Sequence, residues 1–551
     1  MTQAQKNYEK LLNIGMIVLL LWHMIMTIGK IFFSTVKAEM IYAAFLFLLS
    51  AVYIVLCRTK WTNTENRIGL ITAKIRTPNQ IICIVFLIWY MISLLINKGP
   101  RVKDNIWLIY DAGINCLLLF NLPVILSKEK GKKIIDFLLC VVSIVGLCYV
   151  IYGLWHLFTL NFFRMESGDF IRMTKNHNFE IGVYYNSTGA FALSFILISL
   201  YMIATQNILI KIFYALTLIP HTLTLFLTNS RAIFIACIAA YFFFVFLTVW
   251  NKTKQKMTAL RLTISILTSA AAAAVIWELR PLAFQLFESV THFSGGQINA
   301  LTLLSQKPAA NIEAFPVNGI SRCMMLFSLS PLFSKKNSKK FSIIVSRFAK
   351  RAVRISLITA LIMVFYTVSS YVLPGNEDNN RSSFIADRIS AQSETAVQSG
   401  EDSVRDINDF STIKSRERTW KYSLEIIKSD WKTFLFGVTP LGFNDAFYKV
   451  SGIGKKYHHA HNEVLNMGVS LGVPMMIVLL IFFISTGIKS FRLGILGRNQ
   501  RFIGAYILPV VYITLIISTL VEAYLFASFT IMSCLFFLFC GWINALDADE
   551  K

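Results

Sequence analysis

The sequence predicts an all-α polytopic membrane protein with about 12–14 transmembrane helices. Hydrophobic residues make up 55% of the 551 residues, and the mean hydropathy is +0.59. The apolar residues lie in repeated runs of about 20 residues, the length at which an α-helix crosses a bilayer. A membrane β-barrel would show short segments of alternating polarity, and the sequence lacks them. Helical spans are therefore expected to account for most of the chain.

The apolar runs place predicted spans along the whole chain. The first run is too long for a signal peptide and lacks a small-residue cleavage site, so we interpret it as a span. A weaker segment, 316–333, is predicted to be a further span, with a surface-lying or re-entrant segment as the alternative, because it contains arginine and proline. The predicted spans cover residues 11–33, 39–57, 80–97, 105–126, 134–158, 187–205, 208–227, 231–250, 259–278, 352–373, 463–487, 503–526 and 528–546.

The basic residues set the predicted orientation of these spans. The formal net charge is +23, but the long polar segment 374–462 holds 12 acidic and 12 basic residues and is neutral. The excess of lysine and arginine lies in short loops at 58–79, 127–133, 251–258 and 488–502, which the positive-inside rule assigns to the cytoplasm. This pattern favours membrane topology over a nucleic-acid partner as the cause of the charge. It places the N-terminus inside and 374–462 outside.

Three regions follow from this topology. Residues 1–373 are expected to form an N-terminal transmembrane bundle with a basic insertion at about 281–351, residues 374–462 a large extracytoplasmic loop, and residues 463–551 the C-terminal transmembrane helices. The nine cysteines lie mostly within apolar runs, and none lies in the loop. Their spacing suggests neither a metal site nor a disulfide framework, so no metal and no cofactor are predicted.

A histidine cluster marks the end of the external loop. His458, His459 and His461 are three of the eight histidines of the chain, and they directly precede the span at 463–487. Asn462 and the following glutamate suit a helix start, and the glycine and proline at 472 and 474 are expected to bend or loosen that helix. A histidine held there can take a proton from a hydroxyl group. The alternatives are a loop cluster of no special role or an adventitious metal site.

Arginines at two other places could bind an anion. Arg231 ends the run Thr228–Asn229–Ser230–Arg231 and is predicted either to bind phosphate or to snorkel at a helix end. Arg416 shares a helical face with Trp420, while Arg418 lies on another face, and this helix is predicted to lie on the membrane with Ile413, Trp420, Leu424 and Ile427 as its apolar face. Asn186, beside Tyr185 and Ser187, is a weaker candidate that could instead cap a helix.

Together these elements resemble the O-antigen ligase and polysaccharide polymerase superfamily. The spacing of His461, Asn462 and Gly472 is similar to the family signature, except that Met475 stands at its last place. The run at 228–231 resembles the family's Thr-x-Ser-Arg element. Arg416 and Trp420, followed by glycines at 437 and 442, resemble its loop pattern. The resemblance covers about residues 183–250 and 410–485, whereas the insertion at 281–351 departs from the usual layout.

The resemblance implies a membrane glycosyltransferase of the GT-C type in the bacterial cytoplasmic membrane, with its site on the extracytoplasmic face. The donor would be a glycan on undecaprenyl diphosphate, and the acceptor another glycan, a lipid or a protein. His461 would be the general base, and Arg231 and Arg416, with Arg418 beside them, would bind the diphosphate. His459 would orient His461 or touch the acceptor, and Asn462 and Asn186 would line the substrate site. We expect a metal-independent reaction that inverts the sugar carbon, and a chain-length regulator or flippase as partner.

Two other classes of function remain open at the level of the sequence. A lipid-linked glycan flippase or another membrane transporter would use ionisable residues in or near spans, of which the chain has Asp111, Glu522, His23, His156 and His221. A receptor would use the external loop, although a neutral segment without cysteines makes a poor independent domain. Within the enzyme hypothesis, ligase and polymerase share donor and base, and we favour polymerase slightly.

Overall fold

The computed structural model describes an all-helical chain with one small sheet. The described residues are 14–25, 27–28, 77–97, 102–125, 128–159, 171–173, 179–181, 185–252, 258–293, 411–452, 459–495, 506–520, 522–525 and 530–548. The predicted spans at 39–57 and 352–373 and the weak segment 316–333 lie outside these residues, as does most of the basic insertion. The prediction of an all-α polytopic protein is confirmed for the part of the chain that is described.

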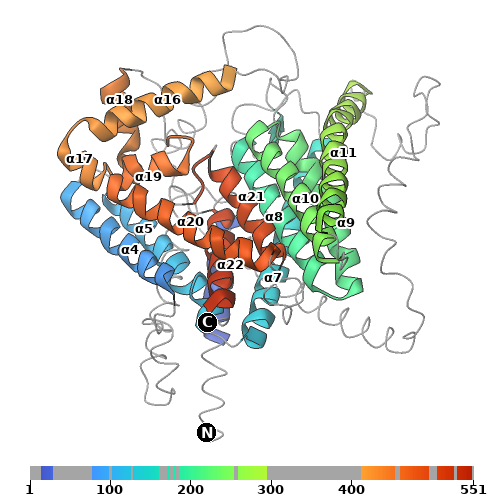
Figure 1. Ribbon diagram of the computed structural model, residues 1–551. Coiled ribbons are helices and arrows are strands. Elements are labelled where there is room, and N and C mark those ends of the chain that lie inside the picture. The colour runs from blue at the N-terminus through green and yellow to red at the C-terminus, as the bar shows by residue number, and fades with distance from the viewer. Residues whose placement is uncertain are drawn as a thin grey trace, which may run out of the picture. The chain divides into compact units, whose positions relative to one another are not determined.

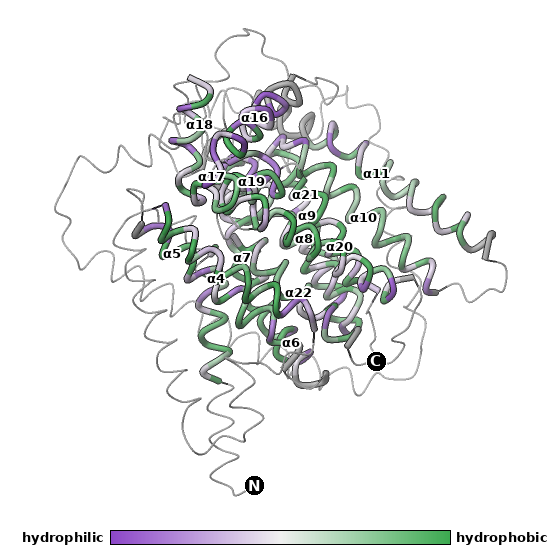
Figure 2. The backbone as a smooth tube through the Cα atoms, turned by 60° about the vertical axis from the view of Figure 1, so that its left-hand side comes forward, coloured by the Kyte–Doolittle hydropathy of each residue, from purple (hydrophilic) through white to green (hydrophobic). Residues whose placement is uncertain are grey.

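Seven described helices are long and apolar enough to cross a membrane. Shorter apolar helices cover Ile14–Ile25, Ile507–Thr519 and Ile531–Leu546. Figure 2 shows the hydrophobic colour along these helices and the polar colour on α16, which lies in the segment predicted to be the external loop. The total of about 12–14 spans stays a prediction. The apolar spans of these seven helices are Pro78–Asn97, Gly131–Trp155, Tyr185–Thr205, Ile208–Leu227, Arg231–Asn251, Leu262–Ala283 and Val473–Gly494.

The first described part of the bundle contains a broken span. The run at 105–126 was predicted as one helix, and this is wrong, because a π-helical turn and a short helix follow its first half. The amide of Asn121 donates to the carbonyl oxygens of Cys116 and Leu117, at 3.3 and 3.0 Å, which satisfies acceptors that a continuous helix would use. The elements are α4 (Pro78–Asn97), α5 (Val102–Gly113), η1 (Ile114–Leu119), α6 (Leu122–Ile125) and α7 (Lys128–Thr159).

The middle of the chain forms a group of long helices around α8. A two-stranded antiparallel sheet precedes this group and pairs Arg172 with Glu180. Of the residues in the apolar stretch of α8, 94% are buried, whereas in α11 only 11% are. Helix α8 therefore lies in the core, and α11 faces outward. Figure 1 shows α8, α9, α10 and α11 side by side. The elements are β1 (Ile171–Met173), β2 (Phe179–Ile181), α8 (Tyr185–Thr205), α9 (Ile208–Leu227), α10 (Arg231–Lys252) and α11 (Thr258–Phe293).

The last part of the chain combines the end of the predicted external loop with the C-terminal helices. In Figure 1, α16, α17 and α18 lie together at the end of the bundle opposite the last turn of α22. Of these, α16 and α18 pack around a small apolar cluster that includes Ile426, Phe443 and Phe447. The elements are α16 (Ser411–Lys428), α17 (Trp431–Phe436), η4 (Pro440–Gly442), α18 (Phe443–Ser451), α19 (Glu463–Leu471), α20 (Val473–Ile495), α21 (Ile507–Thr519) and α22 (Ile531–Ala548).

The buried face of α16 differs from the predicted one. Leu424 was expected on the apolar face, but its exposed fraction is 43%. Thr419, Ser423 and Ile426 are buried instead, at helical spacing, because this face meets α18 and α19. The Ser423 hydroxyl donates to the Thr419 carbonyl oxygen at 2.8 Å, which gives this buried hydroxyl a partner within the helix.

The predicted span at 463–487 is two helices separated at Gly472. Its φ is +91°, and a Cβ added there would lie 2.1 Å from the carbonyl oxygen of Leu435. Gly437 has φ +67°, and a Cβ there would lie 2.3 Å from the backbone carbon of Ser470. The absence of both side chains lets the turn after α17 approach the end of α19, where Val438 N donates to Val469 O at 2.9 Å. This close approach holds α19 in place.

Replacing Gly472 by alanine should destabilise the protein strongly. The added methyl group collides with backbone that cannot rotate away, and the positive φ adds strain, so we expect a loss of about 2–4 kcal/mol or failure to fold. Gly452→Ala is the matched control, because Gly452 also has a positive φ, +64°, but its Cβ would meet no described atom within 4 Å. Thermal unfolding in detergent measures both. An equal effect of the two substitutions would refute the role of the close approach.

Candidate functional site

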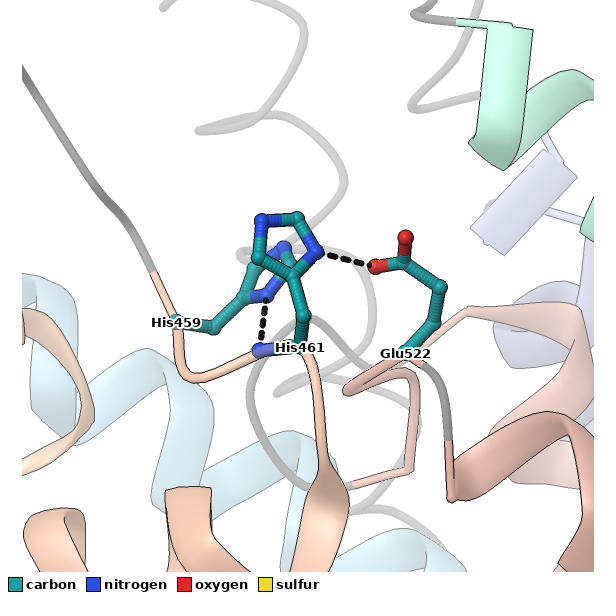
Figure 3. Close-up of side chains that lie close together, drawn as sticks. All are labelled: His459, His461 and Glu522. Atoms are coloured by element: carbon teal, nitrogen blue, oxygen red, sulfur yellow. Dashed lines mark hydrogen bonds and ion pairs between the residues drawn. The ribbon is translucent and has the colours of Figure 1, made fainter. Parts of the chain in front are cut away.

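A buried carboxylate organises the candidate site. Glu522 lies between α21 and α22, with its side chain 2% exposed. Its Oε2 is 2.9 Å from Nδ1 of His461, and its Oε1 accepts hydrogen bonds from Arg416 at 3.1 Å and from Nδ2 of Asn186 at 2.9 Å. Figure 3 shows the His461 ring turned toward this carboxylate. His461, Arg416 and Asn186, which the sequence analysis predicted as site residues in three distant segments, therefore all contact Glu522.

The surroundings of Glu522 keep it ionised. Burial by itself would raise the pKa of this carboxyl group. The charge of a protonated His461 ring and its hydrogen bond, with the charge of Arg416, outweigh burial and lower the pKa of Glu522 to about 2. The carboxylate is therefore an acceptor only, and every group that contacts it must donate.

The ionised carboxylate determines which nitrogen of a neutral His461 ring carries the hydrogen. Because the carboxylate only accepts, Nδ1 of His461 carries the hydrogen, and in the neutral ring Nε2 is left with a lone pair. Figure 3 shows the second ring nitrogen turned away from Glu522. The side chain is 22% exposed, and the residue has φ +51°, a strained backbone for a residue other than glycine. His461 is thus held in a geometry suited to accepting a proton.

His459 lies directly against His461. The backbone N–H of His461 donates to Nδ1 of His459 at 3.3 Å, and the two ring centroids are 4.4 Å apart, edge to face. This contact supports the expectation that His459 orients His461. His458, the third histidine of the predicted cluster, lies outside the described residues.

The start of α19 anchors the loop that carries Glu522. Asn462 is the N-cap of α19, as predicted, because its Oδ1 accepts from Leu465 N at 3.0 Å. Its Nδ2 donates to Leu520 O at 3.0 Å, and Oε2 of the buried Glu463 accepts from Leu525 N at 2.9 Å. Both side chains therefore hold 520–525 against the helix start. Asn462 was predicted as a substrate-binding residue, and its amide is engaged within the protein.

Asn186 connects the carboxylate to the second arginine motif. Its Oδ1 accepts from the hydroxyl of Ser230 at 2.6 Å while its Nδ2 donates to Glu522, so its side chain does not serve as a simple helix cap. Arg231 follows Ser230 directly as the first residue of α10 and is partly exposed. Arg418 is exposed and makes no hydrogen bond or ion pair with the described residues of the site.

Glu522 was not predicted to belong to the site. Glu522 was counted among the ionisable residues of a possible transporter. It is the only charged residue between 502 and 546, in an otherwise apolar stretch, and that isolation was the available signal. The structure shows that its partners are a histidine, an arginine and an asparagine that lie 61, 106 and 336 residues away in the chain.

Two histidines and the carboxylate of this site are also the candidate metal ligands in the described part of the chain. His459, His461 and Glu522 each offer a ligand atom, and these atoms lie within 4.8 Å of one another. A cation there would bind close to the positive charge of Arg416, and if it used Nδ1 of His461 it would displace the hydrogen that Glu522 accepts. The hydrogen bonds already formed by the carboxylate oppose such binding.

Comparison with known proteins does not assign the chain to a family. No protein-family model matches it, and no curated protein is significantly similar to it. Its function therefore has to be argued from its own residues.

Replacing Glu522 by glutamine should destabilise the protein by about 1–3 kcal/mol at neutral pH, because Arg416 loses its buried counter-charge. The folded-state pKa of Glu522 is lowered from 4.5 to about 2, so its charge stabilises the fold fully above about pH 4.5. That contribution is lost as the pH falls toward 2. The stability gap between wild type and variant should narrow over the same range.

Thermal unfolding in detergent at several pH values measures this gap. Glu417→Gln is the matched control, because Glu417 is exposed on the same helix as Arg416. An equal loss in the control, or a gap that does not change with pH, would contradict the assigned charge of Glu522.

Proposed function

We propose that the protein is a membrane glycosyltransferase that moves a glycan from undecaprenyl diphosphate to an acceptor hydroxyl in cell-surface polysaccharide assembly. The observation that carries the proposal is the shared carboxylate. Glu522 binds a histidine and an arginine at the same time, so a base and a cation are held side by side. Glycosyl transfer from a diphosphate needs both groups near the same sugar carbon.

His461 supplies the base in this proposal. Its Nε2 takes the proton of the acceptor hydroxyl as the oxygen attacks the anomeric carbon, and the ionised Glu522 stabilises the imidazolium that forms. The bond from that carbon to the diphosphate oxygen breaks, and its electron pair leaves with the diphosphate. In-line attack inverts the configuration of the sugar carbon.

Arginines stabilise the charge of the leaving group. The ion pair with Glu522 uses one amino group of Arg416 and fixes the orientation of its guanidinium, which has five N–H donors in all. Arg231 adds a positive charge at the first residue of α10, where the helix dipole also favours an anion. Fixed cations beside the developing charge can replace a metal ion in this role.

The setting of the reaction follows from the topology that the charges predict. We infer an extracytoplasmic site in a bacterial cytoplasmic membrane, with a lipid-linked donor in the outer leaflet. The acceptor is a glycan in a polymerase and a lipid or protein in a ligase, and the same base and cations serve both. A flippase that delivers the donor and a chain-length regulator are the partners that such chemistry requires.

The transport alternative has weaker support. His23 is buried and lies 3.3 Å from Oδ1 of Asn115, whereas His221 is buried in another helix and stacks on Phe195 at 5.2 Å. Asp111 is buried in α5. His23 contacts Asn115, one turn after Asp111, whereas His221 lies on α9 and Glu522 belongs to the histidine–arginine site. The ionisable residues that the structure describes therefore suit chemistry at one end of the bundle better than a continuous path.

Turnover of an undecaprenyl-diphosphate glycan by the purified protein tests the proposal. In the presence of a chelator, wild type should release undecaprenyl diphosphate. Loss of the base in His461→Ala should reduce the rate by about 10²–10⁴-fold, and loss of the cation in Arg416→Ala by about 10²–10³-fold. Lys421→Ala, which removes an exposed cation of the same helix, should stay close to wild type.

Two outcomes would overturn the proposal. Equal release by wild type, His461→Ala and Arg416→Ala would remove the catalytic assignment. Activity that disappears in chelator and returns with Zn²⁺, while His459→Ala abolishes the response, would replace the base mechanism by a metal site at His459, His461 and Glu522.

A further inference from the structure

Arg280 is a buried cation that none of the sequence motifs contains. It lies on α11 with 4% of its surface exposed. Its NH2 donates to Oδ1 of Asn229, and its Cζ lies 4.9 Å from the ring centroid of Phe234. Asn229 and Phe234 flank the N-terminus of α10, so the guanidinium of Arg280 is held against the same turn that presents Arg231.

Arg231 and Arg280 are close enough for their charges to repel each other. Burial of Arg280 strengthens that repulsion, because the protein interior screens charge less than water does. Two guanidinium groups held in this way are stabilised most by an anion that both can reach, and a phosphoryl group accepts hydrogen bonds from several guanidinium N–H groups at once.

The amide of Asn229 points to the same ligand chemistry. Asn229 has φ +54° and is 3% exposed, and its Oδ1 accepts from Arg280. Its Nδ2 is buried and meets no hydrogen-bond acceptor in the part of the chain that the structure describes. Buried amide donors are almost always paired in folded proteins, so a donor of this kind beside two arginines indicates an acceptor supplied by a ligand.

We propose that Arg231, Arg280 and Asn229 form a second phosphate subsite, which makes the protein selective for a polyprenyl diphosphate over the monophosphate. Arg416 then binds one phosphate, and the pair Arg231–Arg280 binds the other. The hydrogen bonds from Ser230 to Asn186 and from Asn186 to Glu522 connect the two cation groups and fix their relative position. The identity of the ligand rests on the proposed function.

Equilibrium binding to the full-length protein in detergent, without acceptor, tests the subsite. The probes are undecaprenyl diphosphate and undecaprenyl monophosphate, and wild type should prefer the diphosphate. Arg280→Gln should weaken diphosphate binding by about tenfold or more and leave monophosphate binding nearly unchanged, because only the second phosphate loses its contacts. Lys421→Gln, which alters an exposed cation of α16, should behave like wild type.

Asn229→Asp keeps the test decisive if Arg280→Gln fails to fold. The aspartate retains the oxygen that accepts from Arg280 and tolerates the positive φ, so the fold should persist, while the amide donor becomes a negative oxygen that repels phosphate. Its preference for diphosphate over monophosphate should fall by about tenfold or more. An unchanged preference in a folded Arg280→Gln or Asn229→Asp protein would overturn the proposal.

Competition with phosphatidylglycerol distinguishes the two sources of a phosphate group. Displacement of undecaprenyl diphosphate by phosphatidylglycerol, lost in Arg280→Gln, would show a site for phospholipid headgroups and overturn the diphosphate assignment. Failure of glycosyl transfer in the turnover assay leaves this binding measurement unaffected, because it needs neither acceptor nor catalysis. The proposed function and the subsite therefore fail in distinguishable ways.

Discussion

The charge of Glu522 is the constraint on which the site depends. An ionised carboxylate removed from water is costly unless cations and donors surround it, and removing one partner leaves the others uncompensated. The partners of Glu522 come from the start of α8, from α16 and from the loop before α19. The fold must therefore bring these segments to one point, and in doing so it sets the proton on His461 and the orientation of Arg416.

The short helix α19 gives this cluster its rigidity. At its start, Glu463 holds the backbone of Leu525, which keeps the loop of Glu522 in place. At its end, Trp89 of α4 donates from Nε1 to Leu471 O at 2.9 Å, and the glycine at 472 packs against backbone. A helix fixed at both ends can carry the strained backbone of His461, because the surrounding contacts determine that conformation.

Local signals predicted the long helices and most of the site, and long-range contacts decided the rest. The predicted spans at 208–227 and 231–250 correspond closely to α9 and α10, because uninterrupted apolar runs of that length have few other stable forms. The break at Gly472 was predicted from the glycine and proline at 472 and 474, whereas the break near Asn121 depends on side-chain hydrogen bonds that hydropathy does not report. His461, Arg416 and Asn186 were recognisable from their residue types and positions. A lone carboxylate such as Glu522 looks the same in a transporter and in an active site until its partners are known.

The lowered pKa of Glu522 also separates its role from that of the base. Beside Arg416 and a protonated His461, the carboxylate stays ionised far below neutral pH, so it is poorly suited to take a proton during turnover. Its charge is therefore a constant of the site, which holds Arg416 in place and supports a positive charge on His461 when that ring takes a proton. Hydrogen bonds through Asn186 and Ser230 connect this fixed charge to the turn beside Arg231. In the proposed reaction, the proton moves to His461 at one end of this hydrogen-bonded chain. The arginines that contact the diphosphate stay fixed, as electrostatic stabilisation of a leaving group requires.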